Sequence, residues 1–429
     1  TVMETGFDIL FFWVARMMMM GCKFMGKPPF PTIYLHAMVR DKNGDKMSKT
    51  KGNVIDPLHL VHGCNGDVVS PQFKADHPEG LPAYGADALR FTLASMSASG
   101  RDIKLSVDRI AGYRAFANKI WNASRFALMR LEGVTPAPLS EAEGILRPAD
   151  RYILSRLARA ATATNQALEE FKFADASSAI YSFFWHEFCD WYIELVKKRL
   201  MGDDEESKAA AQSTLVAVLD EALRLLHPMM PFITEELWQK LPIDRDRGTI
   251  MLAAYPDEIK RFADDTIEQE YALVKDAITA VRTIRAESNV SPGKRVDATF
   301  ICLKEETQEM LRAHESELIH LAKLTSLTIQ DNTAPRPEQA GVKVMEHFET
   351  AVPLKGLVDF AEEAARLQKS IDKHTAEHDK IAKKLSNENF VARAPEHVVA
   401  KDRARVAELQ TMLAQMNESL NRVQEMVEG

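Results

Sequence analysis

Two lysines in a loop of small residues are the first feature with an obvious chemical use. The segment 41–57 reads DKNGDKMSKTKGNVIDP, and it places Lys46 and Lys49 three residues apart between two turn sequences. Two ammonium groups on such a loop can close over a polyphosphate and neutralise the charge that develops on a pyrophosphate leaving group. A solvated basic loop is the commoner meaning of such a pattern, so the lysines alone leave both interpretations open.

A second group of candidate residues lies near the start of the chain. The segment ETGFDILFFWVARM contains Gly6, Asp8, Phe12 and Trp13. An aspartate can accept hydrogen bonds from the vicinal hydroxyls of a ribose, and aromatic side chains can form a dry pocket for a branched aliphatic group. The plainer interpretation is a buried strand that enters a helix.

The surrounding pattern predicts several domains in a mainly α-helical chain. Short apolar runs alternate with Gly and Pro up to about residue 110, which is typical of α/β structure with parallel strands. Helical periodicity follows and predicts a bundle. Two heptad helices then flank a break at Pro395 and favour an antiparallel hairpin. The expected parts are a partial Rossmann-like α/β domain over 1–110, an α-helical bundle over 111–265, a small α+β module over 266–354 and a coiled coil over 355–429.

Composition excludes several classes of function. A net charge of −8 argues against a nonspecific polyanion binder, so any nucleic-acid surface must be local. The four cysteines are scattered, which fits a reducing, cytoplasmic location, and the apolar stretches near the start are too short to span a bilayer. His59, His62 and Cys64 lack a fourth ligand nearby, so we expect no metal site and no structural zinc.

The lysine loop resembles the KMSKS signature of class I aminoacyl-tRNA synthetases, and its continuation GNVIDP is similar too. The resemblance implies that Lys46 and Lys49 are catalytic and contact the phosphates of ATP. It also implies that Met47 and Ser48 set the shape of the loop. Thr50 replaces the usual final serine and keeps its hydroxyl.

The start of the chain is similar to the strand-to-helix element of the valine, isoleucine and leucine branch of that family. By this resemblance Gly6 and Asp8 lie against the ribose of the adenylate, and Phe12 and Trp13 line the amino-acid pocket. HAMVRD resembles the strand before the signature loop, so His36 is expected near adenine, although a lone histidine beside a strand is as often a core residue.

The helical region resembles the anticodon-binding domain of this branch. GYRAFANKIWNASRF matches its first helix, which makes Lys119, Asn122 and Arg125 candidates for RNA contact. A solvated helix face is nearly as common for any one of them. Helical spacing favours core packing for the aromatic residues, namely Trp121, Trp185, Trp191, Tyr192 and Trp238.

The C-terminal heptads resemble the tRNA-binding arm of valyl-tRNA synthetases. Carried over, Lys383, Lys384 and Arg393 contact phosphates at the tRNA elbow. An ordinary solvated coiled coil is an equal alternative, because acidic residues interleave with the basic ones. His374 and His378 occupy seam positions, where polar residues more often fix register than bind a ligand.

Taken together, the resemblance implies activation of valine by ATP, with Mg²⁺ accompanying the nucleotide as substrate, and transfer to tRNA(Val) by a monomer. The complementary HIGH motif does not occur in the sequence. We therefore expect that motif and the editing domain to precede Thr1, the chain to begin inside a domain, and this chain alone to be inactive. Two alternatives stay open, namely an isoleucyl- or leucyl-type enzyme and a noncatalytic tRNA-binding protein.

Overall fold

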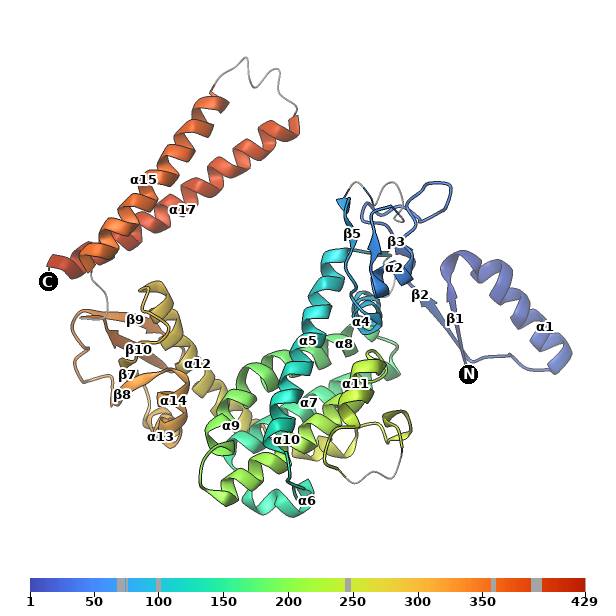
Figure 1. The fold of residues 1–429 in the computed structure, drawn as a ribbon, viewed down its shortest axis with the longest axis horizontal. Coiled ribbons are helices and arrows are strands. Elements are labelled where there is room, and N and C mark those ends of the chain that lie inside the picture. The colour runs from blue at the N-terminus through green and yellow to red at the C-terminus, as the bar shows by residue number, and fades with distance from the viewer. Residues whose placement is uncertain are drawn as a thin grey trace. The chain divides into compact units, whose positions relative to one another are not determined.

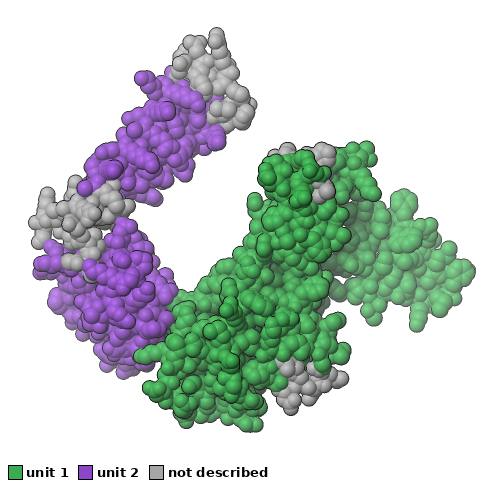
Figure 2. All heavy atoms as spheres, in the orientation of Figure 1, with its two compact units in different colours: residues 1–269 green, residues 270–429 purple. Residues whose placement is uncertain are grey.

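The computed structural model describes residues 1–67, 74, 76–97, 102–243, 248–355, 360–386 and 396–428. These residues form two compact units, 1–269 and 270–429, which Figure 2 distinguishes by colour. Within the described residues, no helix combines the length and the apolar character that crossing a lipid bilayer requires. The prediction of a mainly helical chain in several parts is confirmed.

Unit 1 begins with a small parallel α/β element (Figure 1). Strand β1 (Val2–Gly6) pairs in parallel with β2 (Thr32–His36), and α1 (Ala15–Met25) connects them. Gly26 ends α1 in a left-handed conformation with a φ of 71°. The predicted strand, helix and strand are therefore present, and their pairing is parallel as expected.

The first strand is shorter than its apolar sequence suggests, and the segment that follows is less buried than the plainer interpretation expects. The β1–β2 register ends where Gly6 meets His36, and the chain then coils through a 3₁₀ turn, Phe7–Ile9, and a π-helical turn, Leu10–Val14. The side chain of Phe12 is 73% exposed and that of Trp13 52%, whereas Val14 is fully buried. A two-stranded ladder has no further partner for these residues, so periodicity alone overestimated both the strand and its burial.

A second small layer supports the lysine loop. Strands β3 (Val39–Arg40) and β6 (Ile103–Lys104) pair in parallel, and β4 (Cys64–Asn65) pairs antiparallel with β5 (Gly80–Leu81). Helices α2 (Pro57–His62) and α4 (Ala86–Met96) complete the layer. Its apolar cluster consists of Leu60, Leu81, Ala88, Leu89, Leu105 and Ile110.

The rest of unit 1 is a helical bundle, coloured from cyan to yellow in Figure 1. Its core is aromatic, with Phe116, Phe184 and Phe188 fully buried. Between α8 and α9 the chain runs through a π-helical stretch, Phe183–Tyr192. The main helices are α5 (Val107–Arg130), α7 (Pro148–Glu169), α8 (Phe173–Ser182), α9 (Ile193–Leu200), α10 (Glu205–Leu226) and α11 (Pro231–Trp238).

The aromatic residues of the bundle are not all in the core. Tyr192 and Trp238 are buried as predicted, and Trp185 and Trp191 are half-buried. Trp121 is 38% exposed, so the prediction that it packs in the core is wrong. It lies on the outer side of α5, while the buried face of that helix carries Phe116 and Ile120.

Unit 2 contains a module built around a mixed sheet of order β8-β7-β10-β9. Strand β7 (Val296–Cys302) is parallel to β8 (Leu324–Asp331) and antiparallel to β10 (Phe348–Pro353), which pairs with β9 (Ala340–Val344). Helix α12 (Asp265–Glu287) precedes the sheet. Helices α13 (Glu305–Ala313) and α14 (Glu315–Leu321) lie between β7 and β8 in the chain. The expected α+β arrangement is therefore present.

The end of the chain forms a helical hairpin of α15 (Phe360–Leu385) and α17 (Glu396–Glu428) (Figure 1). Its ion pairs join Lys384 to Asp402 and Glu377 to Arg405, so residue numbers rise along one helix as they fall along the other. The predicted antiparallel arrangement is confirmed. The seam histidines His374 and His378 are 22% and 21% exposed, respectively, at the side-chain level.

Candidate functional site

The carboxyl ends of the parallel strands β1 and β2 bring three predicted residues together. Gly6 faces His36 in the register, and Asp8 follows directly after β1. A Cβ atom added at Gly6 would lie 2.8 Å from Asp8 Oδ1 and 3.4 Å from Met38 Sδ, so only glycine fits without displacing its neighbours. Ligands of parallel α/β sheets bind at this edge, outside the carboxyl ends of the strands.

The lysine loop is held by two buried polar residues, Asp41 and Asn53, each 4% exposed. Asn53 Nδ2 donates to Asp41 Oδ2 at 2.9 Å, and Asn53 Oδ1 accepts from the backbone N–H of Ser48 at 2.9 Å. Asp41 Oδ1 also accepts from the N–H of Asp45 at 2.8 Å. These bonds, that from Asn53 foremost, lower the pKa of Asp41. The backbone of the loop is therefore fixed from its base.

Sequence reasoning did not assign a role to Asp41 or Asn53. Asp41 lies in the turn sequence DKNG, and Asn53 lies in GNVIDP, the continuation of the signature. The sequence does carry one signal for them: both are short polar residues that flank the loop and adjoin apolar runs. A carboxylate buried there needs hydrogen-bond donors close by, which a neighbouring amide can supply. Met47 and Ser48 are half-buried, and Ser48 Oγ accepts from the N–H of Lys51 at 3.2 Å.

The lysines of the loop remain exposed. Lys46 Nζ lies 3.3 Å from Asp8 Oδ2, and both side chains are more than half exposed. Lys49 is exposed, and no described carboxylate lies within ion-pair distance of its ammonium group. An exposed ion pair contributes little free energy, so a phosphate can replace Asp8 as the partner of Lys46 at small cost. The loop and the strand edge thus meet at one place.

The other predicted residues near this edge are arranged less tightly. His36 is half-buried, and its Nδ1 lies 3.1 Å from the carbonyl oxygen of Ala37. Phe12 and Trp13 are exposed rather than enclosed, and the guanidinium carbon of Arg16 lies 5.5 Å from the centre of the Trp13 ring. Among the residues that the structure describes, no group of three or more His, Cys, Asp or Glu side chains could hold a metal ion.

A cavity of about 410 Å³ opens on the outer side of α5. The exposed ring of Trp121 lies in its wall, with the ammonium group of Lys240 5.0 Å from the ring centre. Arg125, a predicted RNA contact, lines the same cavity. The remaining lining residues are Leu128, Met129, Leu131, Glu132, Leu237 and Pro242. The cavity therefore combines an aromatic face, an apolar floor and two cations.

The two other candidates on α5 lie elsewhere. Asn122 is exposed. Lys119 forms an ion pair with Asp190, and its ammonium group lies 4.1 Å from the centre of the Trp185 ring. Lys119 is therefore engaged within the bundle, whereas Arg125 faces a cavity.

The arm residues also differ from one another. Lys383 is exposed, and Lys384 Nζ lies 2.7 Å from Asp402 of the facing helix. Arg393 lies outside the described residues. Acidic partners thus neutralise part of the basic face of the arm.

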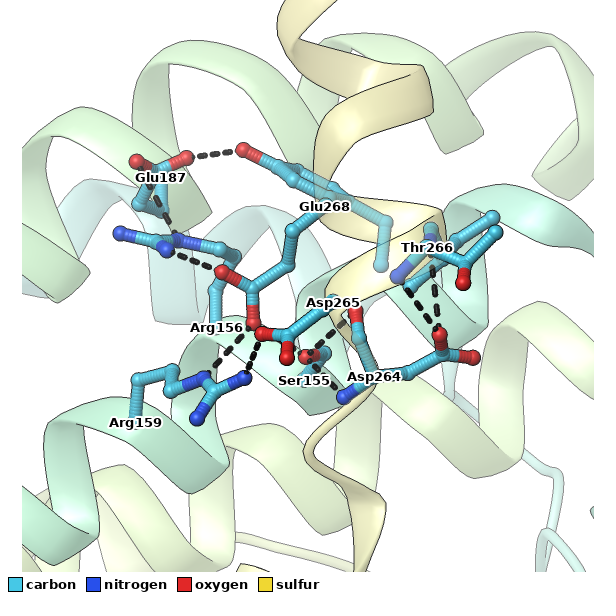
Figure 3. A network of polar contacts seen from close by, with 10 residues as sticks. Ser155, Arg156, Arg159, Glu187, Asp264, Asp265, Thr266 and Glu268 are labelled. Carbon is cyan, nitrogen blue, oxygen red and sulfur yellow. Dashed lines mark hydrogen bonds and ion pairs between the residues drawn. The ribbon is translucent and has the colours of Figure 1, made fainter.

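A polar network fixes the start of α12 on the bundle (Figure 3). Glu268 accepts from Arg156 at 2.6 Å and from Arg159 at 3.1 Å, and it also bonds the hydroxyl of Ser155. Asp264 caps the helix by accepting from the N–H groups of Thr266 and Ile267. An arginine that binds RNA needs N–H groups without an acceptor in the protein. Arg156 and Arg159 donate to carboxylates instead, so we interpret the network as structural.

Three family models match successive parts of the chain. The model described as tRNA synthetases class I (I, L, M and V) matches residues 1–106. The anticodon-binding domain of tRNA ligase matches residues 150–300, and the valyl tRNA synthetase tRNA binding arm matches residues 359–424.

Similarity to individual proteins extends over nearly the whole of this chain. The chain is 48% identical to a valine–tRNA ligase of Syntrophotalea carbinolica, over 98% of this chain and 44% of that protein. It is 49% identical to the valine–tRNA ligase of Geobacter sulfurreducens, over 94% and 43%, and 44% identical to that of Brucella suis, over 95% and 42%. The chain thus spans less than half the length of these relatives. It belongs to the valine–tRNA ligase family of class I aminoacyl-tRNA synthetases.

Proposed function

We propose that this chain supplies the phosphate-binding loop, part of the adenylate site and the tRNA-binding parts of an enzyme that joins valine to tRNA(Val). The observation that carries the proposal is the approach of Lys46 to Asp8, 3.3 Å apart. It brings the lysine loop to the strand edge where Gly6 and His36 meet. Membership of the valine–tRNA ligase family supports this chemistry, and so does the proximity of the loop to the strand edge.

In this proposal ATP enters as substrate with Mg²⁺ and lies across the edge of β1 and β2. Asp8 accepts hydrogen bonds from the ribose hydroxyls, and Gly6 leaves room for the sugar against the backbone. Lys46 and Lys49 neutralise the charge that grows on the leaving pyrophosphate. The Asp41–Asn53 pair holds the loop so that little ordering is needed when the nucleotide binds. Phe12 and Trp13 lie beside this site for contact with the valine side chain.

The cavity beside Trp121 is proposed to take an unstacked base of the tRNA anticodon. An exposed indole offers a stacking face, and Arg125 and Lys240 lie where they can meet a neighbouring phosphate. Asn122 and Lys119, which lie on α5 outside this cavity, are proposed as further contacts to the tRNA. Lys383, Lys384 and Arg393 are proposed to meet the tRNA through the arm. A cytoplasmic monomer is proposed for the whole enzyme.

The lysine loop is tested in the full-length ligase with Lys46→Ala and Lys49→Ala. Removing an electrostatic stabiliser of a developing charge costs about 10²- to 10³-fold in rate, and we expect that loss in valine-dependent exchange of pyrophosphate into ATP for Lys49→Ala. Lys23→Ala, an exposed lysine on α1, is the matched control. Unchanged exchange in the double variant would refute the proposed role. The 429-residue chain alone is expected to show no exchange.

The cavity is tested by binding of tRNA to the chain with Trp121→Ala. Loss of one stacked base costs about 1–3 kcal/mol, so affinity for tRNA(Val) is expected to fall by about 5- to 150-fold. Phe232→Ala removes another exposed aromatic ring of the bundle, 65% exposed, and is expected to leave binding intact. A panel of purified tRNAs separates the alternatives. Preference for the isoleucine acceptor supports an isoleucyl-type enzyme, and equal binding of all acceptors supports a noncatalytic binder.

A further inference from the structure

Arg285, at the end of α12 in unit 2, is a buried cation without an acidic partner. Arg285 is 7% exposed. The guanidinium donates to the carbonyl oxygens of Ser291, Pro292 and Lys294 at 3.2, 3.3 and 2.7 Å, and to that of Ala322 at 3.0 Å. Arginine stays charged in proteins, and carbonyl groups do not cancel its charge. The loop 291–295 therefore folds around a positive charge.

Two exposed cations, one at the end of this loop and one beside it, also bond to carbonyl oxygens. Lys323 Nζ donates to Pro292 O at 2.8 Å, and Arg295 Nη1 donates to Leu324 O at 2.8 Å. No described carboxylate lies within ion-pair distance of Arg285, Arg295 or Lys323. Each exposed cation keeps further N–H groups, because an arginine carries five donors and a lysine three.

The backbone of the loop adds donors of its own. The carbonyl groups of Pro292 and Lys294 point toward Arg285. The chain has no cis peptide bond, so the next N–H groups, those of Gly293 and Arg295, point the opposite way. Neither N–H donates to a residue that the structure describes. The N–H of Lys294, which lies between them, donates to Ser291 O at 3.0 Å, so the two outward N–H groups stand on either side of a closed turn. Outward-directed backbone N–H groups of a turn are donors for an anion.

Several cations elsewhere in the molecule have partners of a different kind. Lys384 and Arg405 in the arm, and Arg156 and Arg159 in the bundle, all meet carboxylates. Loop 291–295 is exposed, as is Lys323, and the outward N–H groups of Gly293 and Arg295 have no acceptor among the described residues. A tetrahedral anion with several acceptor oxygens satisfies cations and amides together.

We propose that the loop 291–295 with Lys323, held by Arg285, binds a phosphodiester group of a nucleic-acid backbone. The inference rests on the proposed function, because tRNA is then the polyanion that reaches this surface. Arg295 and Lys323 contact phosphate oxygens directly, and the N–H groups of Gly293 and Arg295 complete the cradle. Arg285 is a positioning residue that shapes the loop and adds its field. Binding here is independent of base identity.

The test uses the full 429-residue chain, purified tRNA(Val) and a titration series over a range of KCl concentrations. The double variant R295A/K323A removes two phosphate contacts. Each contact changes the slope of log affinity against log salt by about 0.7–0.9, so the slope is expected to fall by about 1.5 and affinity at 0.1 M salt by at least about 10-fold. The control R312A/R336A removes two exposed arginines of the same unit, one of them paired with Glu349, and is expected to keep the slope.

The outcomes separate this proposal from the proposed function. If the double variant and the control share the wild-type slope, or if the wild-type chain binds no RNA at low salt, the phosphate site is refuted. If the slope falls as expected but all tRNAs bind equally, the site stands and the valine-specific function fails. Circular dichroism of both variants checks that the sheet remains folded, and the reversal R295E/K323E is expected to weaken binding further.

Discussion

The lysine loop and the helical bundle use charged residues in opposite ways. In the loop, the buried polar groups Asp41 and Asn53 bond to backbone and to each other, and the cations stay at the surface. In the bundle, buried carboxylates such as Asp150 hold arginines directly. A cation that must meet a substrate is left with a weak exchangeable partner, whereas a cation that holds helices together is saturated by hydrogen bonds.

The energetic consequence follows from burial. Asp150 is fully buried and receives two bonds from Arg199, at 2.9 and 2.7 Å, and one from the hydroxyl of Tyr192 at 2.8 Å. The Lys46–Asp8 pair is more than half exposed on both sides. Breaking the first pair strands a buried charge, and breaking the second frees two solvated groups. Mutations in the two regions should therefore separate stability from activity.

The largest expected effect is on stability, from Asp150→Ala. Removing this carboxylate takes away the buried negative charge that faces Arg199, whose side chain is 17% exposed. The free energy of unfolding of unit 1 is therefore expected to fall by about 3–5 kcal/mol. All five tryptophans lie within residues 1–269, so their fluorescence during urea titration reports on this unit. Asp265→Ala, which removes an 82% exposed partner of Arg159, is the control and is expected to cost at most about 1 kcal/mol.

The second prediction concerns activity. Asn53→Ala in the full-length ligase removes the acceptor of the Ser48 N–H and the donor to Asp41 Oδ2, which costs about 1–3 kcal/mol locally. We expect valine-dependent pyrophosphate exchange to fall about 5- to 100-fold, mainly through a higher KM for ATP, with thermal unfolding of the bundle unchanged. Asn53→Asp should be worse, because two carboxylates then face each other. Full activity of both variants would contradict the anchoring role.

The sequence predicted the elements of the site better than their surroundings. Periodicity located bundle helices such as α7 and α10 because each of them buries one face of its own pattern. It overestimated burial at Phe12 and Trp121, because whether an apolar side chain is covered depends on distant elements that pack against it. Likewise, no local signal ties Asn53 to Asp41, or gathers four carbonyl groups around Arg285, since these contacts exist only in the folded chain.

A third prediction is a pH dependence in unit 2. Burial opposes the charge of His314, but hydrogen bonds and the negative charges of Glu317 and Glu270, 2.7 and 2.6 Å away, outweigh it and raise the pKa above the usual 6.5. The protonated histidine therefore stabilises the fold fully below pH 6.5, and this contribution is lost as pH rises through the raised pKa. The stability difference between wild type and His314→Gln should shrink as pH rises from 6 toward 9, with the ring titration followed by NMR. A constant difference would contradict the assignment.

The smallest expected effect tests whether the arm resembles the loop or the bundle. Lys384 lies 2.7 Å from Asp402, with the lysine 45% exposed, so Lys384→Ala should change arm stability by at most about 1 kcal/mol. If the arm meets RNA phosphates, Asp402→Ala removes a competing carboxylate and should strengthen tRNA binding a few-fold, while Lys384→Ala weakens it by a similar factor at low salt. If the pair is purely structural, both variants bind tRNA equally well. If Asp402→Ala strengthens tRNA binding and Lys384→Ala weakens it, Lys384 resembles the lysines of the loop. Only a cation that exchanges a carboxylate for a phosphate is expected to give both changes.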